Sequence, residues 1–489
     1  MASLDELKNT RLAKLKALKD AGVEAYPAEA KRDESLGEVV THFDKLSASG
    51  KEFSLVGRVM SLRGQGALIF SDIFDGTGKL QILLKSDEMS GNFFKLFQDT
   101  VDIGDFLEVH GTLFVTKRGE KTLQVKSWKM LTKSLLPLPE KWHGLTDVEE
   151  RFRKRYLDIL MDPEIRELFV KKSKFWDVTR SFMKKEGFME VETPTLEVTT
   201  GGAEATPFKT HHEDFDLDVF MRISIGELWQ KRLMAAGYPK TFEIGRAYRN
   251  EGTDVNHVQE FTNLEFYLAY ANYEDGMKLV ERLYQTIAKE VFGTTKFTSR
   301  GVEFDFSGEW KRMDYRDTVK KETGIDVLDS SDKEIEKKLK ELKITYDGTT
   351  RERMIDTLWK YCRKKIAGPV FLVNHPKIVS PLAKSKPENP ELTERFQIIL
   401  AGTEVGNGFS ELNDPVEQRK RFETQQELLK SGDKEAMMAD WEFVEMLEHG
   451  MPPTCGFGFG ESLFAILVDK PIREVQIFPL MRPKDGVKE

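Results

Sequence analysis

The sequence has few cysteines and no long apolar run. Only two of its 489 residues are cysteine, Cys362 and Cys455, and they stand far apart. Two distant thiols provide neither a disulfide framework nor the spacing of a zinc site, which fits a reducing compartment. Since no run of about 18 apolar residues occurs, the sequence predicts no membrane span. The N-terminus carries acidic residues and lacks an apolar core segment, so we expect no signal peptide and a cytoplasmic protein.

The sequence also lacks a strong excess of either charge. Its formal net charge is −8, and charged residues make up 32% of the chain. A coat of nucleic acid is therefore not expected, although a local basic face is enough to contact phosphates. One candidate face lies on the helix predicted over residues 3–21; the alternative is a solvated helix with ordinary charges. Its basic residues are Lys8, Arg11, Lys14, Lys16 and Lys19.

The length and the changes of pattern predict two or three domains. After an N-terminal helical extension, residues 1–50, short alternating apolar runs occupy residues 51–135. About five strands in such a stretch predict a small closed barrel of the OB type. Residues 136–160 read as a linker. The rest, 161–489, mixes helices and strands, so we expect an α+β domain with a charge-rich helical insertion at about 310–368.

The segment FEIGRAYRNEGTDVNHVQEFTNLEFYLAY, residues 242–270, predicts two strands around a polar loop. The first strand is expected to hold Arg249 and Glu251, and the return strand Glu265. An arginine on a rigid strand suits a phosphate, because its planar fork binds two oxygens. The alternative is a hairpin with surface salt bridges, but aromatic and acidic residues crowd the same faces as Arg249.

A second segment, ERFQIILAGTEVGNGFSELNDP, covers residues 394–415 and contains two closely spaced glycines. Glycines let the backbone approach a ligand closely. A substrate that ends in an ammonium group needs carboxylate partners when it is buried. Glu265 and Glu411 are the candidates for such a pocket. The functional candidates within this segment are Glu404, Asn407, Phe409 and Glu411.

Together these motifs resemble the class II aminoacyl-tRNA synthetases, and the lysine-specific members in particular. Residues 186–212, 242–270 and 451–483 resemble motifs 1, 2 and 3 of that family, in the family's order along the chain. The pattern GNGFSELND resembles the lysine enzymes more than their aspartate or asparagine relatives. The resemblance covers nearly the whole chain. It implies a catalytic domain built on an antiparallel sheet flanked by helices.

The resemblance implies roles for individual residues around ATP. Arg249 would bind the α-phosphate and act in catalysis, and Phe261 would lie under the adenine ring. Glu404 would contact ATP and, with Gln397, hold Mg²⁺ on the phosphates. Further ATP contacts are implied for Glu251 and His257.

The same resemblance implies a lysine pocket. Glu227 would hold the α-amino group of the substrate, and Asn407 would bind its carboxylate end. The side-chain ammonium would meet Glu265 and Glu411. Gly202 would contribute its backbone. The walls around the aliphatic stem would be Tyr267 and Phe409.

Residues outside the catalytic pocket have implied partners too. Pro194 in motif 1 stands at the position that shapes the family's dimer interface, which implies a homodimer. The barrel would bind the anticodon of tRNA(Lys), with Phe70 as a stacking platform beside Arg63 and Gln81. The alternative for Phe70 is a place in the barrel core. The implied activity is the ATP-dependent joining of L-lysine to its tRNA through a lysyl-adenylate, with release of AMP and pyrophosphate.

Two positions depart from the family's pattern. In motif 3 the family has an acidic residue followed by arginine, whereas this chain has Glu461 followed by Ser462. The missing arginine normally meets the γ-phosphate and stacks on the adenine. Gln397 stands where the lysine enzymes usually have glutamate. An amide oxygen still suits Mg²⁺, with weaker binding than a carboxylate.

Two other functions share parts of this pattern. A synthetase-like modifier would attach lysine to a translation factor, but such relatives lack the N-terminal barrel. A catalytically weakened paralogue would bind tRNA or lysine as a regulator, an interpretation suggested by Ser462. Arg249 argues against it, because a pure binding protein has little use for an α-phosphate contact.

Overall fold

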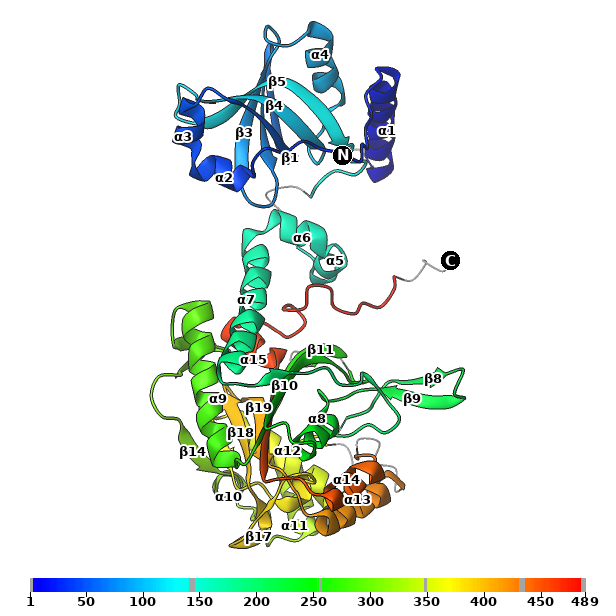
Figure 1. Ribbon diagram of the computed structural model, residues 1–489, viewed down its shortest axis with the longest axis vertical. Coiled ribbons are helices and arrows are strands. Elements are labelled where there is room, and N and C mark those ends of the chain that lie inside the picture. Colours follow the sequence, from blue (N-terminus) through cyan, green and yellow to red (C-terminus); the bar gives the residue numbers. More distant parts are fainter. Residues whose placement is uncertain are drawn as a thin grey trace. The chain divides into compact units, whose positions relative to one another are not determined.

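The computed structural model divides the chain into two compact units, Met1–Thr146 and Asp147–Glu489 (Figure 1). No described helix is both long and apolar enough to cross a membrane. The described residues are 3–139, 146–203, 205–252, 254, 257–346, 350–430 and 436–484.

Unit 1 contains a barrel of five strands, closed in the order β1-β2-β3-β5-β4. Alternation of residue types makes these strands: from Ile69 to Ile73 every second side chain of β2 is buried. The closed barrel confirms the fold expected from the sequence. The helices of unit 1 are α1 Leu4–Asp20, α2 Leu36–Thr41, α3 Phe43–Ala48 and α4 Gly91–Thr100. Its strands are β1 Glu52–Gln65, β2 Leu68–Phe74, β3 Lys79–Lys85, β4 Phe106–Val115 and β5 Lys121–Thr132.

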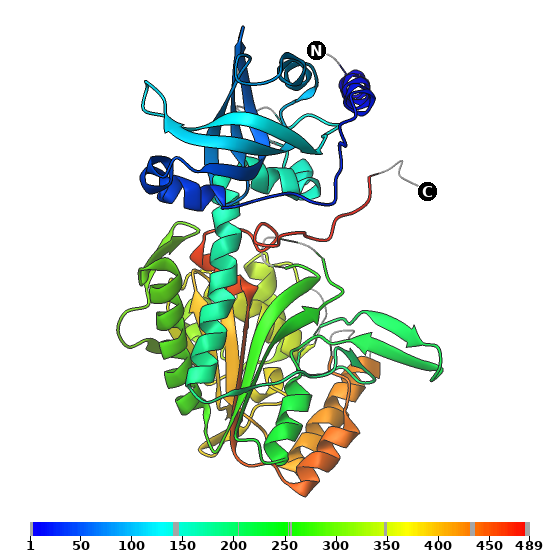
Figure 2. The same cartoon turned by 45° about the horizontal axis from the view of Figure 1, so that its top comes forward.

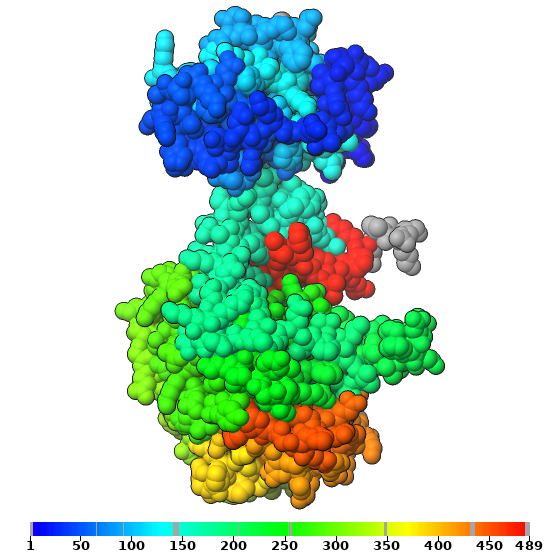
Figure 3. Space-filling model, viewed as in Figure 1, coloured from blue at the N-terminus to red at the C-terminus, as the bar shows by residue number. Residues whose placement is uncertain are grey.

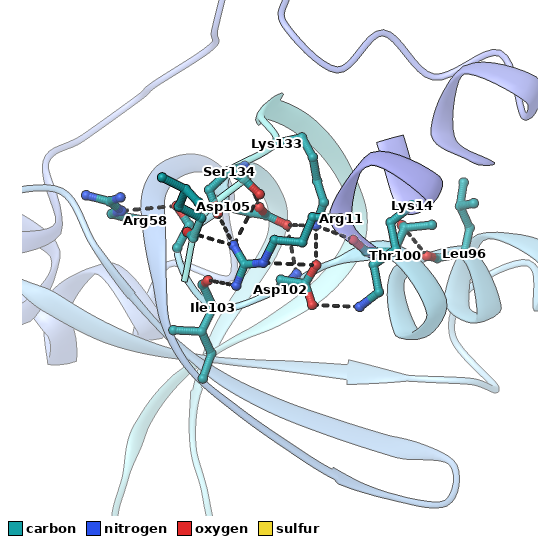
Figure 4. A network of polar contacts seen from close by, with 12 residues as sticks. Arg11, Lys14, Arg58, Leu96, Thr100, Asp102, Ile103, Asp105, Lys133 and Ser134 are labelled. Atoms are coloured by element: carbon teal, nitrogen blue, oxygen red, sulfur yellow. Dashed lines mark hydrogen bonds and ion pairs between the residues drawn. The ribbon is translucent and has the colours of Figure 1, made fainter. Parts of the chain in front are cut away.

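A buried ion network lies beneath α1 (Figure 4). The Lys133 side chain is fully buried, and its Nζ lies 2.5 Å from an Asp102 oxygen and 2.8 Å from an Asp105 oxygen. The same ammonium donates a hydrogen bond to the backbone oxygen of Thr100 at 2.6 Å. All three donor positions of the ammonium are thus used, as a buried charge requires.

The network also holds α1 on the barrel. Lys14 lies 2.6 Å from Asp102, and the buried Arg11 reaches across to the segment after β5. Two basic residues of the candidate phosphate-binding face therefore hold the helix in place, while Lys8, Lys16 and Lys19 remain exposed. The Arg11 guanidinium donates to the backbone oxygens of Ile103, Ser134 and Leu136.

Replacing Lys133 with methionine should destabilise unit 1 by about 3–5 kcal/mol, because it leaves the buried Asp105 carboxylate without its cation, whereas Asp102 keeps Lys14. The measurement is hydrogen–deuterium exchange of the β1–β5 peptides in the full chain, which should become much faster. Lys117→Met, at an exposed turn, is the matched control and should leave exchange unchanged. Equal protection in both variants would mean that the network contributes little.

The remaining described helices and strands belong to unit 2. Its helices are α5 Val148–Arg153, α6 Arg155–Met161, α7 Pro163–Lys185, α8 Glu227–Ala235, α9 Tyr273–Ile287, α10 Tyr315–Thr323, α11 Asp332–Glu341, α12 Arg351–Arg363, α13 Pro415–Lys430, α14 Trp441–His449 and α15 Glu461–Leu467, with a π-turn at Ala288–Phe292 and a 3-10 turn at Lys377–Val379. Its strands are β6 Met189–Glu190, β7 Leu196–Glu197, β8 Lys209–His212, β9 Leu217–Met221, β10 Lys240–Tyr248, β11 Glu260–Ala269, β12 Lys296–Ser299, β13 Val302–Asp305, β14 Lys311–Asp314, β15 Val370–Val373, β16 Ser385–Lys386, β17 Asn389–Thr393, β18 Arg395–Leu400, β19 Thr403–Ser410 and β20 Thr454–Gly460.

The core of unit 2 is an eight-stranded sheet in the order β14-β15-β18-β19-β20-β11-β10-β6. Its central pairs are antiparallel, and only its two edge pairs are parallel. Helices α7 and α9 cover one face of this sheet (Figure 2). The arrangement confirms the α+β domain with an antiparallel sheet flanked by helices. Helices α10, α11 and α12 connect β14 to β15 and share a separate apolar cluster.

Strand β20 shows how the sequence makes the two faces of the sheet different. In the run GFGFG, Phe457 and Phe459 belong to the core beneath α7 and α9. Because successive side chains of a strand point to opposite faces, the intervening glycines lie on the other face. That face therefore carries no β20 side chain from Gly456 to Gly460, which leaves room for side chains of neighbouring strands to lie over β20.

Candidate active site

The face of the sheet opposite α7 and α9, on which the β20 glycines lie, is called the open face below. It carries residues from strands that are distant in the chain. Across β11, β20 and β19, Glu265 lies opposite Gly458, which lies opposite Asn407. In the next row, Tyr267 and Phe409 flank Gly456 in the same way. Since directly paired residues share a face, the expected lysine-pocket residues of β11 and β19 stand side by side over the glycines.

The glycines of β20 are needed because side chains lie over them. A Cβ at Gly456 would stand 2.1 Å from Glu411 Oε1 and 2.6 Å from a ring carbon of Tyr267. At Gly458 it would stand 2.9 Å from Glu265 Cγ. The strand thus forms the floor of a pocket whose walls are acidic and aromatic.

Three carboxylates line this pocket. Glu227, Glu265 and Glu411 are only 6%, 8% and 1% exposed. They come from the start of α8, from β11 and from the residue after β19. Sequence reasoning placed all three in one site, and the structure brings them together.

A buried lysine sits among these carboxylates, and sequence reasoning missed it. Lys231 is 1% exposed, and its Nζ lies 2.9 Å from Glu227 Oε1 and 2.6 Å from Glu411 Oε2. It stands one helical turn after Glu227 on α8, the spacing at which glutamate and lysine side chains meet. That spacing was the available signal, but it is equally typical of an exposed helix face.

Burial and like charges shape the electrostatics of the pocket. Burial raises the pKa of Glu411, Lys231 opposes that shift, and Glu227 adds to it. Burial also raises the pKa of Glu265, with a further contribution from Glu227. Each shift means that an ionised carboxylate here is short of positive partners, so the pocket favours a ligand with ammonium groups.

Gly202 lies directly against this cluster. Its φ is +88°, a conformation that favours glycine. A Cβ there would stand 2.5 Å from Ser224 Oγ and 2.8 Å from Glu227 Oε2. The backbone of Gly202 therefore borders the pocket where the α-amino group of a substrate is expected.

Arg249 lies at the other end of the open face. Its guanidinium stands 5.3 Å over the Phe261 ring, and its Nε donates to the backbone oxygen of Ile223 at 3.3 Å. Burial lowers the pKa of Arg249, while the nearby acids Glu251, Glu265 and Glu404 oppose that change. This half-buried cation forms no ion pair with a carboxylate among the described residues, so it is available to an anionic ligand such as a phosphate.

His257 lies apart from this group. Its ring is 2.8 Å from an Asp254 oxygen, and its side chain is more than half exposed. Glu251 stands two residues after Arg249, and its backbone N–H donates to the backbone oxygen of Arg249 at 2.9 Å. The structure thus gathers Arg249, Phe261 and Glu251, and it places His257 on an exposed loop.

The residues expected to hold magnesium share the open face because of a β-bulge. The register of β18 and β19 shifts so that Gly406 pairs with Ile398 but Glu404 pairs with Ile399. Val405 is the extra residue and enters the core, which leaves Glu404 on the open side.

These residues fit a Mg²⁺ ion that keeps water and phosphate ligands. Gln397 Oε1 is buried without a hydrogen-bond partner in the described part of the chain. Among the described residues no group of three or more His, Cys, Asp or Glu could hold a metal ion. Magnesium is commonly bound through one or two protein oxygens plus substrate phosphates, so Glu404 and Gln397 suffice. Arg363 from α12, which the sequence did not suggest, lies 3.6 Å from Glu404.

The motif 3 departure lies at the start of α15. Glu461 is buried, accepts a hydrogen bond from the backbone N–H of Thr262 at 3.1 Å, and pairs with Lys172 at 3.1 Å. Ser462 beside it is half-buried. The acidic residue therefore fastens α15 to β11 and α7, and the short Ser462 side chain cannot extend a positive charge along the open face.

Comparison with known proteins agrees with this geometry. Residues 147–482 match the family model of class II tRNA synthetases for aspartate, lysine and asparagine. The chain belongs to the class II tRNA synthetases. Residues 53–131 of this synthetase match the OB-fold nucleic acid binding domain of tRNA anticodon type.

Relatives across the full length of this synthetase carry the name lysine--tRNA ligase. The protein of Thermotoga maritima is 43% identical over 99% of this chain and 98% of its own length. A Roseiflexus protein is 42% identical over 99% and 100%, and one from Moorella thermoacetica 41% over 98% and 99%. These similarities confirm the lysyl-tRNA synthetase family and the ligase class that the motifs predict.

The barrel of this synthetase places its three expected anticodon residues on the outward surface. Phe70 is half-buried, stands opposite Arg63 in the β1–β2 pair, and is not part of the barrel core. Gln81 on β3 donates a hydrogen bond to Thr122 Oγ1 at 3.0 Å. The alternative of a core position for Phe70 is therefore wrong, and a stacking role stays a prediction.

The expected dimer residue of this synthetase lies on the surface of unit 2. Pro194 is exposed between β6 and β7, beside the exposed Leu196 and Val198. The nearby β8–β9 hairpin projects from the unit and carries Phe215, which is 75% exposed (Figure 3). A dimer interface at Pro194 stays a prediction.

Proposed function

We propose that this synthetase joins L-lysine to tRNA(Lys) with ATP. The observation that carries the proposal is the cluster of three buried carboxylates, Glu227, Glu265 and Glu411, with Arg249 close enough to Glu265 to interact with it. A lysine side chain needs carboxylates around its ammonium, whereas an aspartate or asparagine side chain needs a donor there. The relatives named lysine--tRNA ligase support the same substrate.

The proposed first step forms lysyl-adenylate. A carboxylate oxygen of lysine attacks the α-phosphorus of ATP, a new P–O bond forms, and the bond to pyrophosphate breaks. Glu227 and Gly202 orient the α-amino group, Asn407 lies at the carboxylate end, and Glu265 and Glu411 hold the side-chain ammonium. Arg249 offsets the negative charge that grows on the α-phosphate, and Phe261 supports the adenine. No protein nucleophile is needed.

Magnesium, when bound, neutralises charge on the ATP phosphates. Glu404 and Gln397 are the residues proposed to hold it, and Glu251 and His257 are proposed as further nucleotide contacts. The half-exposed position of His257 fits a contact made only when ATP is bound.

The proposed second step transfers lysine to tRNA. A terminal ribose hydroxyl attacks the adenylate carbonyl, and AMP leaves. Phe70, Arg63 and Gln81 are proposed to bind anticodon bases through stacking and hydrogen bonds. We further propose a cytoplasmic homodimer with Pro194 at its interface.

The test of the function is lysine-dependent exchange of labelled pyrophosphate into ATP, with Mg²⁺ and without tRNA. Exchange with lysine, but not with aspartate or asparagine, is the expected result. A folded protein that binds lysine but supports no exchange would favour the weakened paralogue instead. The closed barrel argues against a modifier of translation factors, whose relatives lack that domain.

Replacing Ser462 with arginine should raise exchange at low ATP concentration. A charge-assisted contact to the triphosphate contributes about 1.5–3 kcal/mol, so kcat/KM for ATP should rise roughly tenfold to a hundredfold. Ser462→Gln adds a side chain without charge and is the control. No gain in the arginine variant would indicate that another cation, such as Arg363 beside Glu404, already meets the phosphates.

A further inference from the structure

Lys231 has no role in the reaction as proposed so far, yet it is as deeply buried as Glu411, at 1% exposure. Its ammonium lies between Glu227 and Glu411, at 2.9 and 2.6 Å. Aromatic rings close the remaining sides, at 5.4 to 6.0 Å from Nζ to the ring centres. These rings belong to Tyr267, Phe409 and Phe443.

The groups around Lys231 come from five elements. Glu227 lies on α8, as Lys231 does. Glu265 and Tyr267 lie on β11, Glu411 follows β19, and Cys455 lies on β20. Helix α14 contributes the uncharged Phe443, while its capping Asp440 pairs with Arg232. The neighbouring Arg222 pairs with Glu243 at 2.7 Å and also opposes the rise in the pKa of Glu265.

The charge count matches a substrate with two ammonium groups. Three carboxylates and one ammonium leave a formal charge of −2 when all four groups are ionised. Lysine brings an α-ammonium and a side-chain ammonium, and its carboxylate faces Arg249. A neutral amino acid would leave one carboxylate buried and unpaired, which is costly.

We propose that Lys231 is the resident counter-ion of this cluster: its ammonium pairs with Glu227 and Glu411 before the substrate arrives and so sets the charge that selects lysine. The inference rests on the proposed function and makes Lys231 a positioning and specificity residue. Without the Lys231 ammonium, the neighbouring carboxylates of the cluster would hold a proton between them, because like charges in a buried site repel one another. Lysine would then have to displace a proton in order to bind.

Burial and charge support this assignment. Burial opposes the charged form of Lys231, but Glu227 and Glu411 outweigh it and raise the pKa of the ammonium. Lys231 in turn works against the burial that raises the pKa of Glu411. Lys231 thus offsets part of the cost of an ionised Glu411, and Glu411 favours the ammonium form of Lys231.

The experiment is calorimetric titration of the full-length protein with lysine between about pH 6 and 9, in buffers of different ionisation enthalpy. Lys231→Met should bind lysine roughly tenfold more weakly than the wild type near neutral pH, and this difference in affinity should become smaller as pH rises. On binding it should release up to about one proton more than the wild type. Lys240→Met, whose Nζ donates to the backbone oxygen of Glu186, is the control and should match the wild type.

The outcomes separate the possible failures. A loss of affinity that is equal at all pH values, with an unchanged proton count, would reduce Lys231 to a packing role and overturn the inference. A wild type that binds no lysine would overturn the proposed function and this inference together. If Lys231→Met does not fold, Lys231→Gln keeps a donor to Glu411 and should show the same extra proton. In Lys231→Arg, which retains the charge, the proton count should return to that of the wild type; a raised count there would also contradict the proposal.

Discussion

Arg249→Ala should lose roughly 10³-fold or more in the rate of lysine-dependent pyrophosphate exchange, because an arginine that stabilises phosphoryl-transfer charge contributes on that scale. The loss should appear mainly in kcat. Its cause is local: Arg249 is half-buried near Glu404, and its guanidinium lies over Phe261. Binding of lysine, measured by calorimetry, should change little, because the carboxylate pocket is intact.

Two further variants make this expectation sharper. Arg249→Lys keeps the charge but loses the planar fork, so a loss of roughly tenfold to a hundredfold is expected. Arg312→Ala removes an exposed guanidinium that pairs with Glu274 away from the pocket, and it should retain full activity. Wild-type exchange in Arg249→Ala would exclude this residue from the α-phosphate contact and would leave the proposed first step without its main cation.

The sequence predicted the two folds because their patterns are local. Alternating runs predicted the barrel, and the GFGFG repeat of β20 carries the two-sided character of the large sheet within five residues. Such period-two patterns follow directly from strand geometry. The motifs then placed the chain in its family, and the family matches confirm that placement.

What the sequence could not predict depends on register and burial. Glu404 reaches the open face because Val405 is the extra residue of a bulge, and no local pattern reveals that shift. Lys231 was missed because a glutamate and a lysine one turn apart more often lie on an exposed helix face. Only the packing of α8 against β11 and α14 makes that pair a buried part of the pocket.

The basic face of the first helix is a second case in which the sequence could not predict burial. Five basic residues suggested a phosphate-binding surface or a solvated helix, and the structure gives a mixed answer. Arg11 and Lys14 turn inward and bond to the barrel, while the others stay exposed. Residue type alone does not distinguish a cation that binds a ligand from one that holds a helix.

The second large effect is expected from the smallest substitution in the pocket, Gly456→Ala. The added methyl group would stand 2.1 Å from Glu411 Oε1 and 2.6 Å from a Tyr267 ring carbon, closer than atoms can approach. Both side chains must move, and with them the Glu411 contact to Lys231 at 2.6 Å. Since overpacking of this kind costs about 1–3 kcal/mol, KM for lysine should rise roughly tenfold to a hundredfold.

Steady-state exchange kinetics with lysine and with ATP varied separately would check this. KM for ATP should stay near the wild-type value, because Gly456 lies in the row of Tyr267 and Phe409 rather than beside Arg249. Gly64→Ala is the matched control: nothing lies within 4 Å of its added methyl group, and it belongs to the barrel, which exchange without tRNA does not need. An unchanged KM for lysine in Gly456→Ala would place the substrate away from Glu411, because a substrate bound there must sense the displaced carboxylate.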